Sequence, residues 1–138
     1  MAIDIKLIGI IPDEVGEPRN DGKPGSALYV VPFRLSGTPS TMWSRIFLET
    51  WDFPPRFTSM HRPGIARVSG DRIVLDGTTI DEVERYHLDT LKLAVAEANR
   101  LAGQEEQKSR QRANADDEKR QQHRQHIAEV AARLKFED

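Results

Sequence analysis

The stretch Ile65-Ala66-Arg67-Val68-Ser69-Gly70-Asp71-Arg72-Ile73-Val74-Leu75 decides the fold. Two short apolar runs flank Gly-Asp, a dipeptide suited to a two-residue β-turn. A turn of that length pairs Val68 with Ile73, and Ala66 with Leu75, so both apolar pairs lie on one face. Because turn length and hydrophobic register agree, the sequence predicts a β-hairpin over residues 65–75.

Two further strands are expected before this hairpin. Residues 2–11 begin with apolar and charged side chains in alternation, a pattern typical of a strand with one buried face. Residues 27–35 also place apolar side chains at alternate positions. Pro32 has no N–H to donate, which predicts that this strand lies at a sheet edge or is interrupted there. The intervening residues 12–26 are rich in Pro and Gly and form a loop.

Two helices complete the domain. The first is predicted over residues 39–51, with Thr38 as its N-cap. The second is predicted over residues 79–101, where Thr79 and Glu82 have the spacing of a capping box. The fold class is therefore α+β: a two-layer sandwich in the order ββαββα, with a four-stranded, mostly antiparallel sheet and two helices on one face.

A charged helical arm follows the compact domain. We place the domain at residues 1–102 and the arm at residues 103–138. Residues 104–126 contain no apolar side chain larger than alanine, so this stretch cannot bury a core face. A short amphipathic stripe returns at residues 127–134, where Ile127, Val130 and Leu134 follow helical spacing. The stripe is expected to dock on a partner or on a copy of itself.

Composition limits the class of protein. The chain has 138 residues, 38% hydrophobic and 30% charged, which fits one domain with an extension. It has no cysteine, which excludes disulfides and thiol chemistry. The sequence shows no signal-peptide pattern and no apolar run long enough for a membrane span, so a cytoplasmic location without membrane contact is expected. With 20 basic and 22 acidic residues, broad electrostatic attraction to nucleic acid is absent.

The loop at residues 51–63 is the first candidate binding site. Trp51, Phe53, Arg56 and Phe57 combine aromatic area with a guanidinium group, and prolines stiffen the segment. The alternative is that these aromatic side chains close one end of the core.

A pocket between this loop and the second helix is the other candidate. It would use His61, Glu84 and His87. The Glu84-x-x-His87 spacing occurs once, whereas di-metal bundles need it twice, so no metal site is predicted. His87 also falls on the apolar stripe of the helix, where a buried structural histidine is the alternative. No nucleophile elbow or phosphate loop is present, and we predict no catalytic residues and no cofactor.

These observations favour a small, non-enzymatic binding or adaptor protein. Its arm, together with the loop at residues 51–63, would contact a partner protein or a second copy, as a coiled coil or other homo-oligomer. One alternative is a small enzyme or ligand-binding domain with the pocket between residues 51–63 and 79–101. The other alternative is weak nucleic-acid binding through arginines of the hairpin face, which are Arg62, Arg67 and Arg72 with Arg56 nearby.

Overall fold

The computed structural model describes residues 4–136. The described residues fall into two units, with the boundary between Gly103 and Gln104. The elements, in chain order, are β1 (Leu7–Ile10), the 3₁₀ turn η1 (Pro12–Glu14), β2 (Tyr29–Leu35), α1 (Thr41–Asp52), β3 (Ala66–Ser69), β4 (Arg72–Thr78), α2 (Ile80–Glu82), the π-helical turn η2 (Val83–His87) and α3 (Leu88–Arg133).

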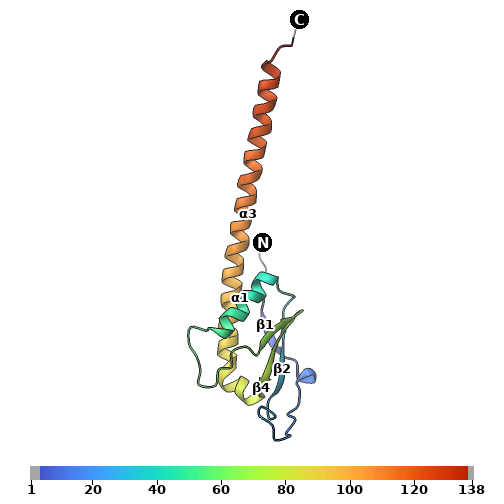
Figure 1. The fold of residues 1–138 in the computed structure, drawn as a ribbon, viewed down its shortest axis with the longest axis vertical. Helices are drawn as coiled ribbons and strands as arrows, with labels where there is room; N and C mark the ends of the chain where they lie inside the picture. Colours follow the sequence, from blue (N-terminus) through green and yellow to red (C-terminus); the bar gives the residue numbers. More distant parts are fainter. Residues whose placement is uncertain (1–3, 137–138) are drawn as a thin grey trace. The chain divides into compact units, whose positions relative to one another are not determined.

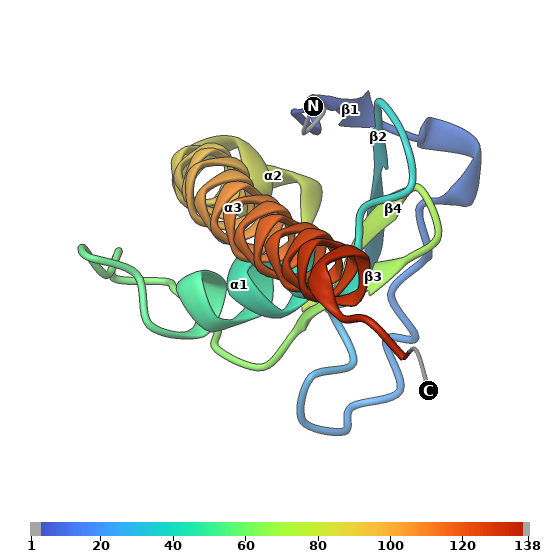
Figure 2. The same cartoon turned by 90° about the horizontal axis from the view of Figure 1, so that it is seen from above.

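The first unit is a two-layer α+β sandwich. Its four strands form one antiparallel sheet in the order β1-β2-β4-β3. Helix α1 and the helical segment that starts at α2 lie on the same face of this sheet (Figures 1 and 2). The predicted fold class is therefore confirmed.

The hairpin that anchored the prediction has the expected register. Ala66 pairs with Leu75 and Val68 pairs with Ile73. Gly70 sits in the turn at φ 58°, a conformation that residues with a Cβ rarely adopt. Strand β4 continues to Thr78 and pairs with β2 on its other side.

Strand β2 is an interior strand, so the prediction of an edge or an interruption at Pro32 was wrong. The Pro32 carbonyl accepts a hydrogen bond from the Ile11 N–H at 3.1 Å. Because a strand residue directs its N and its C=O to the same side, the missing donor of Pro32 also faces β1. Strand β1 ends at Ile10, so the sheet loses little pairing there.

Both helix starts refine the sequence prediction. Helix α1 begins at Thr41, and its N-cap is Ser40, whose hydroxyl accepts a hydrogen bond from the Trp43 N–H at 3.1 Å. The prediction of Thr38 as the cap was wrong by two residues, because serine is an equally good cap nearer to the apolar spacing. Thr79 caps α2 as predicted and accepts from the Glu82 N–H at 3.1 Å.

The second helix differs from a regular α-helix in two ways. After one turn it widens into η2, and it then continues as α3 past the predicted end at residue 101. Within residues 4–136, no α3 residue after Ala102 is buried, which fits the absence of large apolar side chains in residues 104–126.

The core of the first unit lies between the sheet and these helices. Strands β2 and β4 contribute Phe33, Ile73 and Leu75, each at most 1% exposed. The helical layer contributes three aromatic side chains and one isoleucine from α1, and small or aliphatic side chains from α3. These are Trp43, Ile46, Phe47, Trp51, Leu91, Ala94, Val95 and Ala98. The alanines of α3 allow close approach of helix and sheet, while α1 fills the remaining volume with large rings.

Candidate functional site

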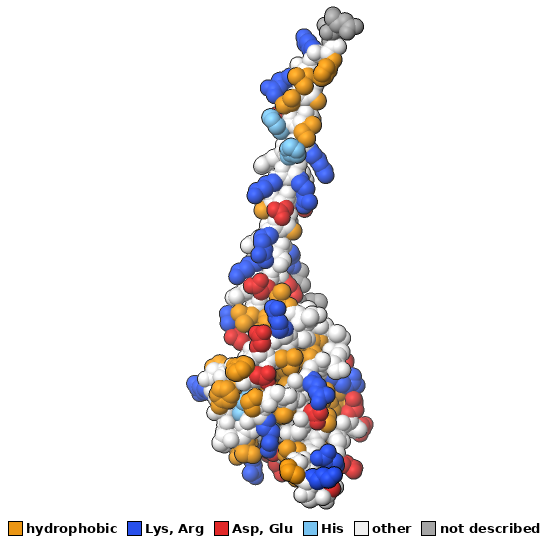
Figure 3. Space-filling view, in the orientation of Figure 1, with side chains coloured by type: hydrophobic (Ala, Val, Ile, Leu, Met, Phe, Trp, Pro, Cys, Tyr) orange, Lys and Arg blue, Asp and Glu red, His pale blue; other side chains and the backbone are white. Residues whose placement is uncertain are grey.

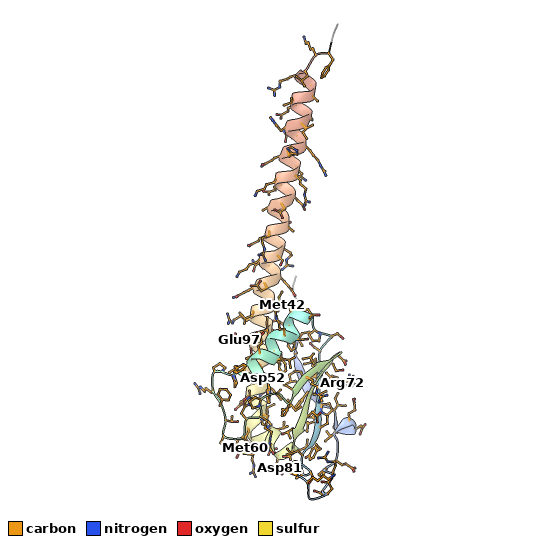
Figure 4. All side chains as sticks on the ribbon, viewed as in Figure 1. Met42, Asp52, Met60, Arg72, Asp81 and Glu97 are labelled. Carbon is orange, nitrogen blue, oxygen red and sulfur yellow. The ribbon has the colours of Figure 1, made fainter. Side chains whose placement is uncertain are left out.

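The loop at residues 53–63 is fastened at both ends. Asp52, at the end of α1 (Figure 4), accepts a hydrogen bond from the Gly64 N–H at 2.8 Å. The indole Nε1 of Trp51 donates to the Arg62 carbonyl at 3.1 Å. The two ends of the loop are thereby held together over α1, and its residues are positioned against the core.

An ion pair ties the same loop to α2. The Arg62 guanidinium donates to both carboxylate oxygens of Glu82, from Nε at 2.7 Å and from Nη2 at 3.2 Å. These bonds lower the pKa of the Glu82 carboxyl, against the opposing effect of its partial burial. The sequence predicted that this carboxylate would complete a capping box with Thr79. Both of its oxygens instead accept hydrogen bonds from Arg62, so the Glu82 side chain links α2 to the loop.

Two histidines and a tryptophan form the centre of the site, which we call the histidine cluster (Trp51, His61 and His87). The Trp51 ring lies 4.8 Å from the His61 ring and 5.5 Å from the His87 ring, measured between centroids. Trp51 and His87 are fully buried. The two histidines of the predicted pocket therefore both contact the same indole ring.

The histidine cluster holds polar atoms away from water. Both ring nitrogens of His61 and of His87, and the hydroxyl of Thr58, are buried without a hydrogen-bond partner. Burial lowers the pKa of His87, and the Glu82 carboxylate, 3.6 Å from His87 Nε2, offsets part of this effect. His87 is thus neutral at pH 7 and lies inside the fold, where it packs as the buried structural histidine considered above.

The π-helical turn η2 places His87 in this position. Such a turn contains one extra residue, which rotates everything after it by about 100° relative to a continuous α-helix. His87 closes the turn, and Leu91 and Ala94 of α3 then continue the buried face. Regular helical spacing gives no signal for such a turn, so the sequence did not reveal it.

The predicted pocket residues do not assemble as one set. Glu84 is exposed and lines a different pocket, beside β1. Among residues 4–136, no three His, Asp or Glu side chains are grouped closely enough to hold a metal ion. The carboxylate near the histidines belongs to Glu82, two residues earlier, and it is committed to Arg62.

The predicted binding residues of the loop divide into buried and exposed members. Trp51 is fully buried and belongs to the core, as in the alternative reading of this loop. Phe53 is 80% exposed, Phe57 is 60% exposed, and Arg56 is also at the surface. The exposed part of the loop therefore offers two phenyl rings and a guanidinium group.

The arginines considered for nucleic-acid binding mostly have acidic partners. Arg62 pairs with Glu82, Arg67 pairs with Asp76, and Arg72 pairs with Glu14 and Asp71. A phosphate would have to displace these carboxylates, which reduces the attraction that such a surface provides.

The C-terminal stripe (Ile127, Val130 and Leu134) lies in the second unit. Ile127 is 53% exposed and Leu134 is 54% exposed, and together with Val130, Ala131 and His126 they line a shallow apolar groove. Figure 3 shows hydrophobic side chains gathered toward the C-terminal end of the arm, beyond a stretch in which charged side chains dominate.

Sequence reasoning missed one further feature, an apolar pocket of about 380 Å³ between β1 and the helical layer. The sequence also indicated no role for Asn99, a polar residue of α3 that lies among buried alanines. Its side chain bonds to Ile5, just before β1. Its carboxamide oxygen accepts from the Trp43 indole at 2.8 Å and from the Ile5 N–H at 2.9 Å.

Comparison of the chain with protein family models, with curated proteins and with solved structures finds no match. None of the helices described within residues 4–136 has an apolar stretch of the length and hydropathy needed to cross a membrane.

Proposed function

We propose that the protein is a non-enzymatic adaptor whose C-terminal stripe docks on a partner protein. The observation that carries this proposal is the exposure of the C-terminal stripe at the far end of α3, where none of the described residues after Ala102 is buried. Ile127 and Leu134 are exposed and Val130 is partly exposed; Leu134 directly follows α3, and its N–H donates to the Val130 carbonyl at 3.1 Å. Aliphatic side chains at positions i, i+3 and i+7 are the anchors by which an amphipathic helix enters an apolar groove.

The neighbouring residues favour a groove over a pair of identical arms. A coiled coil would extend the stripe toward the N-terminus at intervals of seven residues. Those positions hold Arg120 in register with Ile127, and His123 in register with Val130. Two paired arms would therefore bury charged or polar side chains immediately before the stripe, whereas a groove on a partner needs only the short apolar segment.

The exposed loop supports a binding role of the first unit as well. Phe53 and Phe57 present aromatic area to solvent on a segment that is fixed at both ends. Such rings lose little conformational entropy on binding. An adaptor needs two contact surfaces, and the loop and the C-terminal stripe are two separate ones.

Site-specific photo-crosslinking tests the proposal on the full chain. A photoreactive phenylalanine analogue at Ala131, which lines the groove, should give a discrete crosslinked product in extract of the native cell. The matched control carries the analogue at Gln122, which lies on the opposite face of the same helix at about 100° per residue. We expect the product from Ala131 and not from Gln122.

Substitution of the C-terminal stripe gives the second arm of the test. Ile127→Gln, Val130→Gln and Leu134→Gln together keep helix propensity and remove the apolar anchors. The crosslinked product from Ala131 should then disappear. Equal products from both faces would contradict the proposal. A crosslinked product with the mass of two copies of this chain would show that the stripe binds a second copy and not a partner protein.

A further inference from the structure

The outer edge of β1 carries the first observation. Strand β1 stands at the end of the sheet order, next to β2 alone. Just before it, the Lys6 N–H donates to the Ser36 Oγ at 2.8 Å and the Lys6 carbonyl accepts from the Ser36 N–H at 2.9 Å. Successive residues of an extended chain direct their backbone groups to opposite sides. Ile5 and Leu7 therefore direct theirs away from β2.

The side chain of Asn99 makes the hydrogen bonds of a neighbouring strand at one position of that edge. Its side-chain oxygen accepts from the Ile5 N–H at 2.9 Å, and its side-chain NH₂ donates to the Ile5 carbonyl at 2.9 Å. This is the pair of hydrogen bonds that one residue of a neighbouring antiparallel strand would make with its N–H and its C=O. Of the backbone of this edge, the carboxamide bonds to Ile5, so we expect the edge from Leu7 onward to accept an added strand.

An apolar groove runs beside this edge. It is the pocket of about 380 Å³, and its walls come from β1, β2 and the helical layer. The apolar lining includes Ile8, Ile10 and Phe33 from the strands, and Ile80, Val83 and Leu88 from the helical side. Ile8 is 60% exposed, so the groove is open to solvent. A strand added to β1 would direct alternate side chains into it.

Two opposite charges mark the helical wall of the groove. Glu84 and Lys92 both line it and both are exposed. They are eight residues apart, which corresponds to about 12 Å along a helix. Residues i and i+4 of a strand lie on one face about 13 Å apart, with residue i+2 between them. One strand can thus place a basic side chain near Glu84, an acidic one near Lys92, and an apolar one in the groove between.

We propose that this groove binds an extended peptide segment of a partner protein as an additional strand on β1, with a basic, an apolar and an acidic residue at alternate positions. A second copy of β1 fits less well. Its centre has Gly9, which brings no side chain, and an irregular register between Leu7 and Gly9.

Fluorescence anisotropy with a defined probe tests the proposal. The probe is a fluorescein-labelled peptide, Ser-Lys-Thr-Leu-Thr-Glu-Ser, titrated with the full chain. We expect saturable binding, and protection of the Leu7 amide, which faces away from β2, from hydrogen exchange when the peptide is bound. The same peptide with alanine in place of leucine should bind at least fivefold more weakly, because it leaves the groove unfilled.

Charge reversal makes the test independent of strand direction. Lys92→Glu leaves two acidic side chains at the groove, so the variant should prefer Ser-Lys-Thr-Leu-Thr-Lys-Ser over the mixed probe by about fivefold. Glu84→Lys should prefer the peptide with two glutamates. Arg85→Glu is the matched control, because Arg85 is exposed next to Glu84 and the net charge changes by the same amount as in Lys92→Glu. It should leave the preference of the native chain unchanged.

Several results would overturn the proposal. One is the absence of saturable binding, and another is a preference that changes as much in Arg85→Glu as in Lys92→Glu. Light scattering that shows a dimer, with the Leu7 amide protected without peptide, would show that a second copy occupies this edge. Binding of the apolar dye anilinonaphthalene sulfonate in the groove without any binding of the peptides would assign it to small molecules.

Discussion

The histidine cluster and the C-terminal stripe place side chains in opposite environments. In the histidine cluster, polar ring nitrogens are buried against an indole. In the C-terminal stripe, aliphatic side chains are exposed at the end of the part of α3 after Ala102, in which no described residue is buried. Buried rings contribute to stability whether or not a ligand is present. Exposed aliphatic groups contribute a favourable free energy only when a binding partner buries them. Substitutions should therefore affect folding in the first region and binding in the second.

Trp51→Ala should have the largest effect. Trp51 is fully buried, contacts both histidine rings and donates to the Arg62 carbonyl. We expect the free energy of unfolding of the first unit to fall by about 3–5 kcal/mol. Urea denaturation followed by circular dichroism measures this, and Ile127→Ala serves as the comparison in the arm. A loss for Trp51→Ala no larger than for Ile127→Ala would contradict the contrast between the two regions.

The Arg62–Glu82 ion pair should have an intermediate effect. Both side chains are partly buried and share two hydrogen bonds. A double-mutant cycle with Arg62→Ala and Glu82→Ala should give a coupling energy of about 1–2 kcal/mol in the free energy of unfolding. The control cycle uses Arg67 and Asp76, a more exposed pair, for which we expect less than about 1 kcal/mol. Equal coupling in the two cycles would show that the loop is not fastened by this pair.

The pH dependence of stability should identify His87. Its pKa in the folded protein lies below the ordinary value near 6.5, chiefly because of burial. The unfolded chain therefore binds more protons as the pH falls below about 6.5. The stabilisation is complete above that pH and is lost as the pH falls toward the folded pKa, with a slope of at most about 1.4 kcal/mol per pH unit.

The groups that face His87 modify this slope. Glu82 raises its pKa, while His61 and Arg62 lower it. His87→Phe should remove most of the pH dependence between pH 5 and 7, as measured by urea midpoints. His123→Gln, on the exposed arm, is the matched control and should leave the slope unchanged. A slope that persists in His87→Phe would assign the effect to other groups.

Local signals made the fold predictable, and long-range contacts limited the prediction. The hairpin register followed from a turn and four apolar residues that lie within a short stretch. The position of β2 in the sheet could not be predicted in this way. Pro32 weakens a sheet only where its missing N–H faces an acceptor on a neighbouring strand. Strand β1 ends where that donor is missing, a fact that depends on pairing with a distant segment.

The candidate sites show the same limit. The sequence placed His61, Glu84 and His87 in one pocket, but the carboxylate beside His87 is that of Glu82. Helical spacing suggested Glu84, whereas the ion pair with Arg62 brings Glu82 beside the ring. Asn99 bonds to Ile5 across 94 residues of sequence, and no periodicity indicates such a contact. By contrast, the C-terminal stripe was readable because helical spacing alone defines it.

Substitution of the C-terminal stripe should have the smallest effect on folding. With Ile127→Gln, Val130→Gln and Leu134→Gln together, the free energy of unfolding of the first unit should change by less than about 0.5 kcal/mol, since these exposed side chains pack on no core. Helix content should persist, because glutamine is a good helix former. Circular dichroism and urea denaturation measure both quantities. A destabilisation of several kcal/mol would mean that the stripe packs on the first unit in solution, and the three side chains would then belong to the core rather than to a docking surface.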